Sequence, residues 1–216
     1  GKERLKSMIE TRPDWCVSRQ RVWGVPLPIF VNKKTKEILV DDKVNENIAS
    51  IYEKEGSDCW FSDDPQRFLG NKYKAEDYEK LSDIVEVWFD SGSTHSFVLE
   101  KREDLKWPAS MYLEGSDQHR GWFHSSLLES CGTRGRAPFE NILSHGFVVD
   151  GKGLKMSKSL GNVIAPEDIL KKYGADILRI WVASSNYSED LRIDYSILDQ
   201  HAESYRKIRN TFRYLL

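Results

Sequence analysis

The chain has few cysteines, and none of them is placed to form a familiar kind of site. Cys16, Cys59 and Cys131 lie far apart in a sequence of 216 residues and include no C-x-x-C pair. An odd number of widely spaced cysteines argues against a disulfide framework and against a zinc site, and it is typical of reduced thiols. We therefore expect a cytoplasmic protein in which this chain holds no metal ion.

Long apolar runs and an excess of charge of either sign are also missing. No stretch approaches the length of a membrane span, and no signal-peptide pattern opens the chain, so we expect no membrane contact. The formal net charge is −2, although 31% of the residues are charged. No overall field therefore draws the chain to nucleic acid, and any contact with an anion must be local.

The length allows one sizeable core, or one core with a small inserted unit. Both ends read as cuts, because residues 1–2 begin inside a charged helical pattern and residues 211–216 stop inside another. A helix is predicted over residues 2–10. Residues 15–28 mix apolar side chains with arginines and end in two prolines, which indicates an approach into a sheet and an extended exit. We interpret Trp15 and Trp23 as core residues.

Residues 31–82 differ in character and predict an inserted unit with a small core of its own. Residues 29–40 have the pattern of a hairpin with a polar turn, and residues 44–55 that of a helix with one apolar face. A charged stretch with scattered aromatic residues follows. Nothing in this span has the pattern of a catalytic site.

Three apolar segments each run into a cluster of polar residues. Residues 84–89 precede 90–95, and residues 111–113 precede 114–119; residues 142–149 form a third strand around Ser144 and His145, and a helix is predicted over 121–131. Strands alternating with helices predict a parallel sheet with crossover helices. Ligands of such sheets bind at the carboxyl ends of the strands, where these clusters fall.

The stretch from Asp150 to Pro166 has the composition of a mobile, cationic loop. Glycines near both ends relax its backbone, and between them lie three lysines and two serines. Most lysine-rich runs are only solvated turns. The alternative is a loop that handles a polyphosphate, because ammonium and hydroxyl donors suit phosphate charge that moves during a reaction.

Three helices are predicted beyond this loop. Pro166 starts the first and Gly174 ends it, residues 175–183 form a second that is mostly buried, and residues 184–194 read as an irregular link. A last helix begins near Ser196, with one apolar stripe and a cationic remainder. That cationic face is usually only solvated, and contact with RNA is the alternative.

Residues Lys155-Met156-Ser157-Lys158-Ser159, followed by Leu160-Gly161-Asn162, resemble the signature loop of class I aminoacyl-tRNA synthetases. Within that class, residues 12–21, 87–92 and 112–123 look like the members of the bacterial type that activate isoleucine. The resemblance covers nearly the whole chain in the right order and is weakest over residues 32–82. Four separate motifs make an accidental match improbable, so the resemblance favours the phosphate-handling interpretation of the loop.

One departure limits what the resemblance implies. The His-Ile-Gly-His segment with which this family holds ATP is not in the chain. The resemblance therefore implies the second half of a catalytic domain, inactive alone, without the editing domain or the zinc module of the parent enzyme. We expect a Rossmann-like α/β catalytic half at 1–30 and 83–165, a connective insertion at 31–82, a helical stem at 166–195, and the start of a helical anticodon-binding domain at 196–216.

The function implied is ATP-dependent ligation of isoleucine to tRNA(Ile) through an isoleucyl-adenylate. ATP would enter as its Mg²⁺ complex, and the parent enzyme would be a monomer. The resemblance assigns catalysis to Lys155 and Lys158, with Lys158 nearer the phosphate. It assigns ATP binding also to Ser157, Ser159, His145, Gly146 and Val148, and aminoacyl-adenylate binding to Glu114, Gly115, Asp117, Gln118, Trp88 and Trp122.

Three alternatives stay open at this point. The two tryptophans suit a structural core as well as they suit a pocket for isoleucine. The chain could also be a module that binds nucleotide or tRNA without catalysis, or part of another nucleotidyl transferase on the same fold. Retention of both loop lysines together with the whole 114–118 segment favours the ligase.

Overall fold

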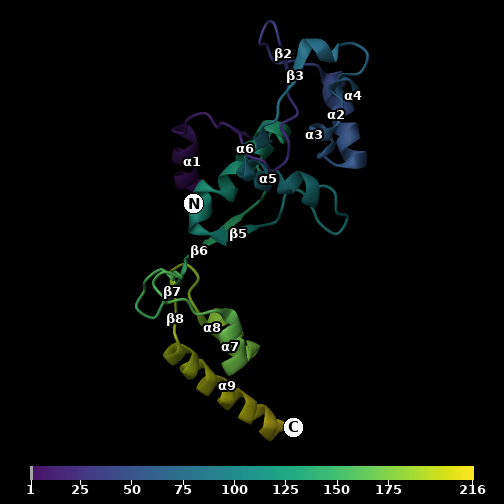
Figure 1. The fold of residues 1–216 in the computed structure, drawn as a ribbon. Helices are drawn as coiled ribbons and strands as arrows, with labels where there is room; N and C mark the ends of the chain where they lie inside the picture. Colours follow the sequence, from purple (N-terminus) through teal and green to yellow (C-terminus); the bar gives the residue numbers. More distant parts are fainter. Residues whose placement is uncertain (1) are drawn as a thin grey trace. The chain divides into compact units, whose positions relative to one another are not determined.

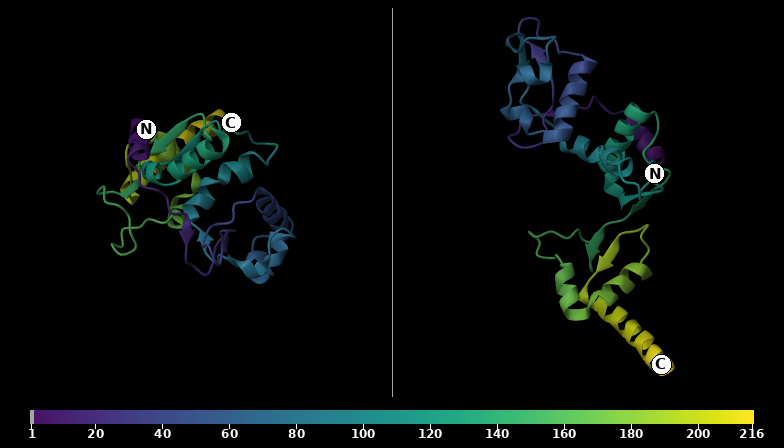
Figure 2. Two further views of the ribbon diagram at one scale, coloured as in Figure 1. Left: turned by 90° about the horizontal axis from the view of Figure 1, so that it is seen from above. Right: turned by 90° about the vertical axis from the view of Figure 1, so that its right-hand side faces the viewer.

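The computed structural model describes residues 2–216, and these residues form two compact units. The first unit consists of residues 2–109 and 120–138, and the second of residues 110–119 and 139–216. Figure 1 labels the helices and strands of both, and Figure 2 gives two further views. No helix among the described residues is long and apolar enough to cross a membrane.

The first unit is mostly helical. Its helices and helical turns are α1 (Lys2–Glu10), α2 (Asp42–Glu55), α3 (Cys59–Ser62), α4 (Pro65–Leu69), the 3₁₀ turn η1 (Ala75–Asp77), α5 (Val87–Gly92), the π-helical turn η2 (His95–Leu99) and α6 (Trp122–Arg134). Its strands are β1 (Ser18–Arg19), β2 (Phe30–Asn32), β3 (Tyr78–Lys80) and β4 (Ile84–Val85), paired antiparallel as β1 with β4 and β2 with β3.

The segment predicted as an insertion has a core of its own. Trp60 and Phe68 are fully buried there, and the Trp60 ring lies 5.0 Å from the rings of both Phe30 and Phe68. Helix α2 begins at Asp42, two residues before the expected start, because the Asp41 side chain accepts hydrogen bonds from the amides of Lys43 and Val44. The hairpin turn is present, and Val31 and Ile38 form a single bridge across it. The domain boundaries that we expect from the sequence stay a prediction.

The strand predicted over residues 84–89 is wrong beyond Val85. Residues Val87–Gly92 form helix α5, and the carboxylate of Glu86 accepts a 3.0 Å hydrogen bond from the amide of Trp88. An acidic side chain in this capping position satisfies an amide that a strand would have paired with a neighbour. A short apolar run does not by itself distinguish the two structures.

The expectation that Trp23 is a core residue is also wrong, because its side chain is 90% exposed. Residues beside it pair along β4: the amide of Val85 donates to the carbonyl of Val25, and that of Leu27 to the carbonyl of Asp83. The backbone of Gly24, at φ +151°, lies against the Ile84 side chain, where a Cβ would come within 2.4 Å. The backbone around Gly24, and not the indole of Trp23, therefore packs against strand β4.

The second unit contains four strands in two parallel pairs. Strands β5 (Tyr112–Gly115) and β6 (Ile142–His145) form one pair, and β7 (Val148–Asp150) and β8 (Leu191–Ile193) form the other. The helices are α7 (Pro166–Tyr173), α8 (Ala175–Ser184) and α9 (Tyr195–Leu215), and the 3₁₀ turn η3 (Ser116–Arg120) follows β5. The predicted α/β class is confirmed.

Two details of this unit differ from the sequence-based prediction. Residues 142–149 form two strands rather than one, and they belong to different sheets. The break falls at Gly146, whose amide donates to the carbonyl of Tyr187 and so leaves the β5–β6 ladder. Strand β8 was expected to be an irregular link. Parallel pairing joins segments distant in sequence, so local composition gives little sign of either feature.

The helices of the second unit share one core. Ile169, Ile177, Trp181, Ile193 and Leu198 are its buried members. Pro166 opens α7 and Gly174 ends it, as predicted. Helix α9 continues beyond the α7–α8 pair (Figure 1), and residues 206–216 are exposed.

Candidate functional site

The carboxyl ends of β5 and β6 bring several of the predicted site residues together. In the register of this parallel pair, Glu114 lies opposite Ser144 and Gly115 opposite His145. A Cβ on Gly115 would come within 2.5 Å of Asp117 Oδ1 and 3.8 Å of His145 Cε1. A side chain at this position would displace the Asp117 carboxylate, so glycine lets the backbone and that carboxylate lie close together.

We call Glu114, Gly115, Asp117, Gln118 and His145 the strand-tip cluster. Some of its polar groups form hydrogen bonds with one another. The amide of Gly115 donates to Glu114 Oε2 at 3.3 Å, and Gln118 Nε2 donates to Asp117 Oδ2 at 3.2 Å. His145 Nδ1 lies 2.7 Å from the carbonyl oxygen of Gly146, and because a carbonyl oxygen can only accept, Nδ1 is the donor of this hydrogen bond. Glu114 and Asp117 are exposed and can accept further hydrogen bonds.

Gly146 and Val148 connect this cluster to the second strand pair. A Cβ on Gly146 would come within 2.3 Å of the carbonyl oxygen of Glu189, so only glycine fits against that backbone. The next amide, of Phe147, donates to Asp190 Oδ1 at 2.8 Å. Val148 pairs with Leu191 in the β7–β8 ladder and is 42% exposed, which leaves an apolar surface at this edge.

Asp150 and Asn162 hold the two ends of the lysine-rich loop together. Asn162 Nδ2 donates to Asp150 Oδ2 at 2.8 Å, while Asn162 Oδ1 accepts from the amide of Ser157 at 2.9 Å. The other oxygen of Asp150 accepts from the amides of Lys152 and Leu154. The hydrogen bond from Asn162, with those two amides, lowers the pKa of Asp150 below its usual value. The carboxylate is therefore charged and fully engaged in shaping the loop.

The two lysines assigned to catalysis project from this shaped loop. Lys155 and Lys158 are exposed, and neither has a carboxylate within ion-pair distance in the part of the chain that the structure describes. The hydroxyls of Ser157 and Ser159 lie 3.1 Å apart, and Ser157 Oγ also accepts from the amide of Leu160. Two unneutralised ammonium groups beside two hydroxyls form a local anion-binding surface.

Trp88 and Trp122 belong to the first unit, on α5 and α6. Trp122 Nε1 donates to the carbonyl oxygen of Ser91 at 3.0 Å, so its indole ties the start of α6 to the end of α5. Trp88 is 43% exposed and lines a small pocket. Trp88 is therefore much more exposed than Trp60, which is fully buried in a core. Trp122 is half-buried.

Sequence reasoning missed a buried carboxyl group between α5 and α6. Both oxygens of Glu129 are buried without a hydrogen-bond partner among residues 2–216, and a Cβ on Gly92 would come within 2.2 Å of Oε1. Burial, and secondarily the Asp90 carboxylate, raises the pKa of Glu129 to about 8. In the sequence, a glutamate within a predicted helix gives no sign that its carboxyl group is buried. Gly92, which lies against that carboxyl group, leaves space for it.

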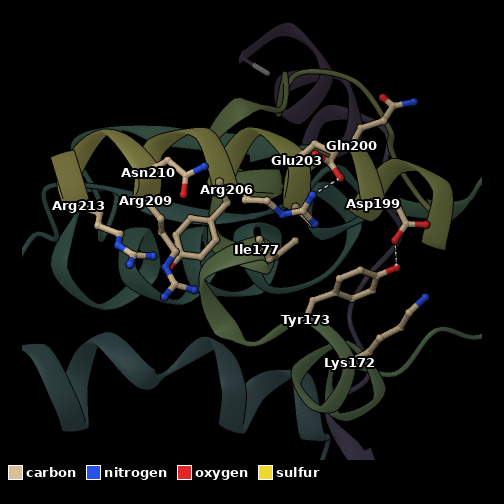
Figure 3. A pocket seen from close by; sticks show the side chains of 12 residues that line it. Lys172, Tyr173, Ile177, Asp199, Gln200, Glu203, Arg206, Arg209, Asn210 and Arg213 are labelled. Carbon is tan, nitrogen blue, oxygen red and sulfur yellow. Dashed lines mark hydrogen bonds and ion pairs between the residues drawn. The ribbon is translucent and has the colours of Figure 1, made fainter.

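A cationic groove runs along α9 and faces α7 and α8 (Figure 3). Its volume is about 810 Å³, and Lys172, Arg206, Arg209 and Arg213 contribute its positive charge. Arg206 pairs with Glu203 at 2.7 Å. Arg209 lies over the Tyr205 ring, and neither Arg209 nor Arg213 has a carboxylate within ion-pair distance among the described residues.

The described residues also include no group of three or more histidine, cysteine, aspartate or glutamate side chains arranged to hold a metal ion. The three groups of polar or charged side chains described above are the strand-tip cluster, the lysine-rich loop and the cationic groove. Asn162 and Glu129 are the residues that sequence reasoning did not select. Asn162 lies at the end of the motif recognised in the sequence. Its amide side chain directly follows Gly161 and the lysine-serine run, and this position was the available sign of a role in shaping the loop.

The chain matches a known protein family. The model of the tRNA synthetases class I (I, L, M and V) matches residues 1–194, and the chain belongs to that family. Its similarity extends to individual relatives: it is 92% identical over all 216 residues to an isoleucine–tRNA ligase of Pelagibacter ubique and 57% identical to one of Zymomonas mobilis. It spans only 24% and 23% of those two proteins, about a quarter of their length.

A solved structure supports the fold. The ternary complex of Agrobacterium radiobacter K84 agnB2 LeuRS with tRNA and LeuAMS matches with a TM-score of 0.68 at 19% identity. The match covers 97% of this chain and 30% of that protein. At this level of identity the comparison establishes a shared fold.

Proposed function

We propose that this chain is part of an enzyme that ligates isoleucine to its tRNA through an isoleucyl-adenylate. The observation that carries the proposal is the 92% identity, over the whole chain, to an isoleucine–tRNA ligase. The lysine-rich loop supports it, since Lys155 and Lys158 offer uncompensated positive charge on a backbone shaped by Asn162. The domain boundaries expected from the sequence, a cytoplasmic location and a monomeric parent enzyme belong to the same proposal.

In the first step, an isoleucine carboxylate oxygen attacks the α-phosphorus of ATP and pyrophosphate leaves. Phosphoryl transfer of this kind depends on positioning and on neutralising the charge that develops on the leaving oxygens. Lys155 and Lys158 supply that charge, with Lys158 nearer the phosphate, and the hydroxyls of Ser157 and Ser159 donate to phosphate oxygens. ATP enters as its Mg²⁺ complex. Both oxygens of Asp150 are engaged, so we place that ion on the phosphates.

The strand-tip cluster binds the aminoacyl-adenylate. Glu114 and Asp117 accept hydrogen bonds from the isoleucine ammonium group or the ribose hydroxyls, and Gln118 adds an amide. Gly115 allows the backbone to approach the ligand. The segment from His145 to Val148 packs against the adenine, and Trp88 and Trp122 form walls for the isoleucine side chain.

The cationic groove on α9 suits the RNA partner. Arg206, Arg209 and Arg213 recur at helical spacing on one face, while Ile208 and Phe212 lie on another and are 45% and 61% exposed. An apolar face packs against protein, whereas Arg209 and Arg213, which have no carboxylate within ion-pair distance among the described residues, suit RNA phosphates. The groove is therefore our candidate for contact with tRNA.

The test is isoleucine-dependent pyrophosphate exchange by the complete enzyme that contains this chain. Lys158→Ala should lower the exchange rate roughly 100-fold, the size typical of losing one donor to a developing oxyanion. Lys155→Ala should act similarly, and Lys152→Ala, on the same loop, is the matched control and should stay within about threefold. Unchanged exchange in Lys158→Ala would contradict the phosphate assignment. Exchange that depends on another amino acid would contradict the choice of isoleucine.

A further inference from the structure

Arg192 is an exposed arginine in the middle of β8, beside the lysine-rich loop. It pairs with Val149 of β7 in the parallel ladder, and its carbonyl oxygen accepts a 3.2 Å hydrogen bond from Trp181 Nε1. Trp181 is a buried member of the core of the second unit. The sheet and the core therefore fix the backbone of Arg192, and its side chain is free to serve another purpose.

The guanidinium group of Arg192 lies against the turn that opens the lysine-rich loop. The amide of Gly153 donates to the carbonyl oxygen of Asp150 and closes this turn, with Gly153 at φ +82°. A Cβ on Gly153 would come within 3.4 Å of Arg192 Nη2 and 3.6 Å of both Cζ and Nε. Near-equal distances to three atoms of a planar group indicate that its flat face covers the glycine.

Arg192 and Lys155 lie on the same face of the strands. Val149 pairs with Arg192 on one side and forms a single antiparallel bridge with Lys155 on the other. Residues directly opposite each other on neighbouring strands share a face, so these three side chains form one row across the strands. Ile193 and Met156, the next residues along each strand, face the other way and pack in the core with the helices.

The charge of Arg192 has no acidic partner. Its side chain forms neither an ion pair nor a hydrogen bond among residues 2–216. Asp190 and Asp194, the acidic residues nearest to it in the sequence, are engaged elsewhere: the first accepts from a backbone amide and the second caps α9. Exposed arginines are usually only solvated. This one is two strand spacings, or roughly 10 Å of backbone separation, from Lys155, and the two cations face the same side.

We propose that Arg192 binds the β- and γ-phosphates of ATP, the two groups that leave together as pyrophosphate. A guanidinium group presents paired donors that match phosphate oxygens, whereas each lysine offers a point charge. The proposal rests on the proposed function and adds to it a residue outside the lysine-rich loop.

The role of Arg192 follows from where charge moves in the reaction. A carboxylate oxygen of isoleucine forms a bond to the α-phosphorus, and the bond from that phosphorus to the bridging oxygen of the β-phosphate breaks. The electron pair of the broken bond stays on the pyrophosphate. Arg192 stabilises the negative charge that develops there, in the same row as Lys155.

The experiment measures isoleucine-dependent pyrophosphate exchange by the complete enzyme that contains this chain. Arg192→Met keeps a long apolar stem that can cover Gly153 but removes the charge, and Arg192→Lys keeps a charge without the paired donors. The matched control is Arg179→Gln, an exposed arginine of the same unit that pairs with Asp176. The KM values for pyrophosphate, ATP and isoleucine are determined separately.

Arg192→Met should raise the KM for pyrophosphate and for ATP roughly tenfold, the size typical of a lost hydrogen bond between charged groups, and Arg192→Lys about threefold. The KM for isoleucine should stay within about twofold in both, and the control should resemble the unsubstituted enzyme. An unchanged KM for pyrophosphate in Arg192→Met would overturn the proposal, because the side chain would then only pack against Gly153. A parallel rise in the KM for isoleucine would also overturn it, because the substitution would then disturb the whole unit.

Failure of the proposed function gives a different result. If the unsubstituted enzyme shows no isoleucine-dependent exchange, the ligase assignment fails while Arg192 can still be tested. Titration calorimetry of the complete enzyme with inorganic pyrophosphate and Mg²⁺ then provides the measurement. Affinity that falls about tenfold in Arg192→Met but not in Arg179→Gln supports the assignment of Arg192, and equal affinity in both overturns it.

Discussion

The indole nitrogen of Trp122 donates a 3.0 Å hydrogen bond to the carbonyl oxygen of Ser91. This bond joins the first residue of α6 to the last turn of α5, the helix that carries Trp88. Both tryptophans assigned to the isoleucine pocket therefore lie on elements that one side chain connects. The indole of Trp122 supports the packing of the first unit, and under the proposed function it would also form a wall of the isoleucine pocket.

Trp122→Phe should separate these two roles. Phenylalanine keeps an aromatic ring but loses the donor, so we expect a loss of about 1 kcal/mol of unfolding free energy and a higher KM for isoleucine. Trp60→Phe is the matched control, because Trp60 Nε1 also donates to a carbonyl, that of Leu81, from a different core. Urea unfolding should respond to both variants, and the KM for isoleucine in the complete enzyme only to Trp122→Phe. An unchanged KM would return Trp122 to a purely structural role.

Asn162 should control the shape of the lysine-rich loop although it carries no charge. In Asn162→Ala the amide of Ser157 and the carboxylate of Asp150 each lose a partner, so the exchange rate of the complete enzyme should fall about tenfold. Hydrogen exchange should also show a less protected Ser157 amide. Asn186→Ala is the control, because the side chain of Asn186 bonds only within its own turn. Unchanged protection of Ser157 would show that Asn162 does not organise the loop.

Glu129 should make the stability of the chain depend on pH. Burial raises its pKa from an ordinary 4.5 to about 8, so the folded chain binds a proton that the unfolded chain releases between these values. Stability from this group is fully present below about pH 4.5, falls as pH rises toward 8, and changes little above. At about 1.4 kcal/mol for each pKa unit, the shift sets an upper bound of about 5 kcal/mol, and partial screening by solvent lowers the expected loss to on the order of 2 to 4 kcal/mol.

Glu129→Gln tests this prediction, because an amide of similar shape does not ionise. Urea unfolding midpoints at pH 5 and pH 8.5 should differ less in the variant than in the unsubstituted chain. Glu203→Gln, at an exposed position on α9, provides the control and should keep the original pH dependence. Equal pH dependence with and without the Glu129 carboxyl would contradict its assignment as a buried, neutral acid.

The α9 groove should contribute salt-dependent affinity for tRNA. The double variant Arg209→Gln with Arg213→Gln should reduce the salt dependence of tRNA binding to the complete enzyme by about two ions, one for each lost phosphate contact. Arg179→Gln is the control, because Arg179 lies on α8 and pairs with Asp176. Pyrophosphate exchange should not change in either. If the double variant and the Arg179→Gln control show the same salt dependence of tRNA binding, Arg209 and Arg213 do not contact tRNA.

Much of the helical structure was predictable from residues close together in the sequence. Asp41 caps α2, and Pro166 and Gly174 bound α7, because caps and breakers act within one turn of the chain. The lysine-rich loop was also recognisable, since its lysines, serines and glycines lie within one short stretch of the sequence. These features can be predicted without knowing which distant residues pack against them.

The sequence by itself determined the α/β class, the two ends of α7 and the lysines of the loop. Only the tertiary structure decided that residues after Glu86 form a helix, that Gly115 lies close to the Asp117 carboxylate, that Glu129 is buried and that Trp23 is exposed. The first group depends on local capping and backbone preference. The second depends on contacts between distant segments, where burial and pairing override local pattern.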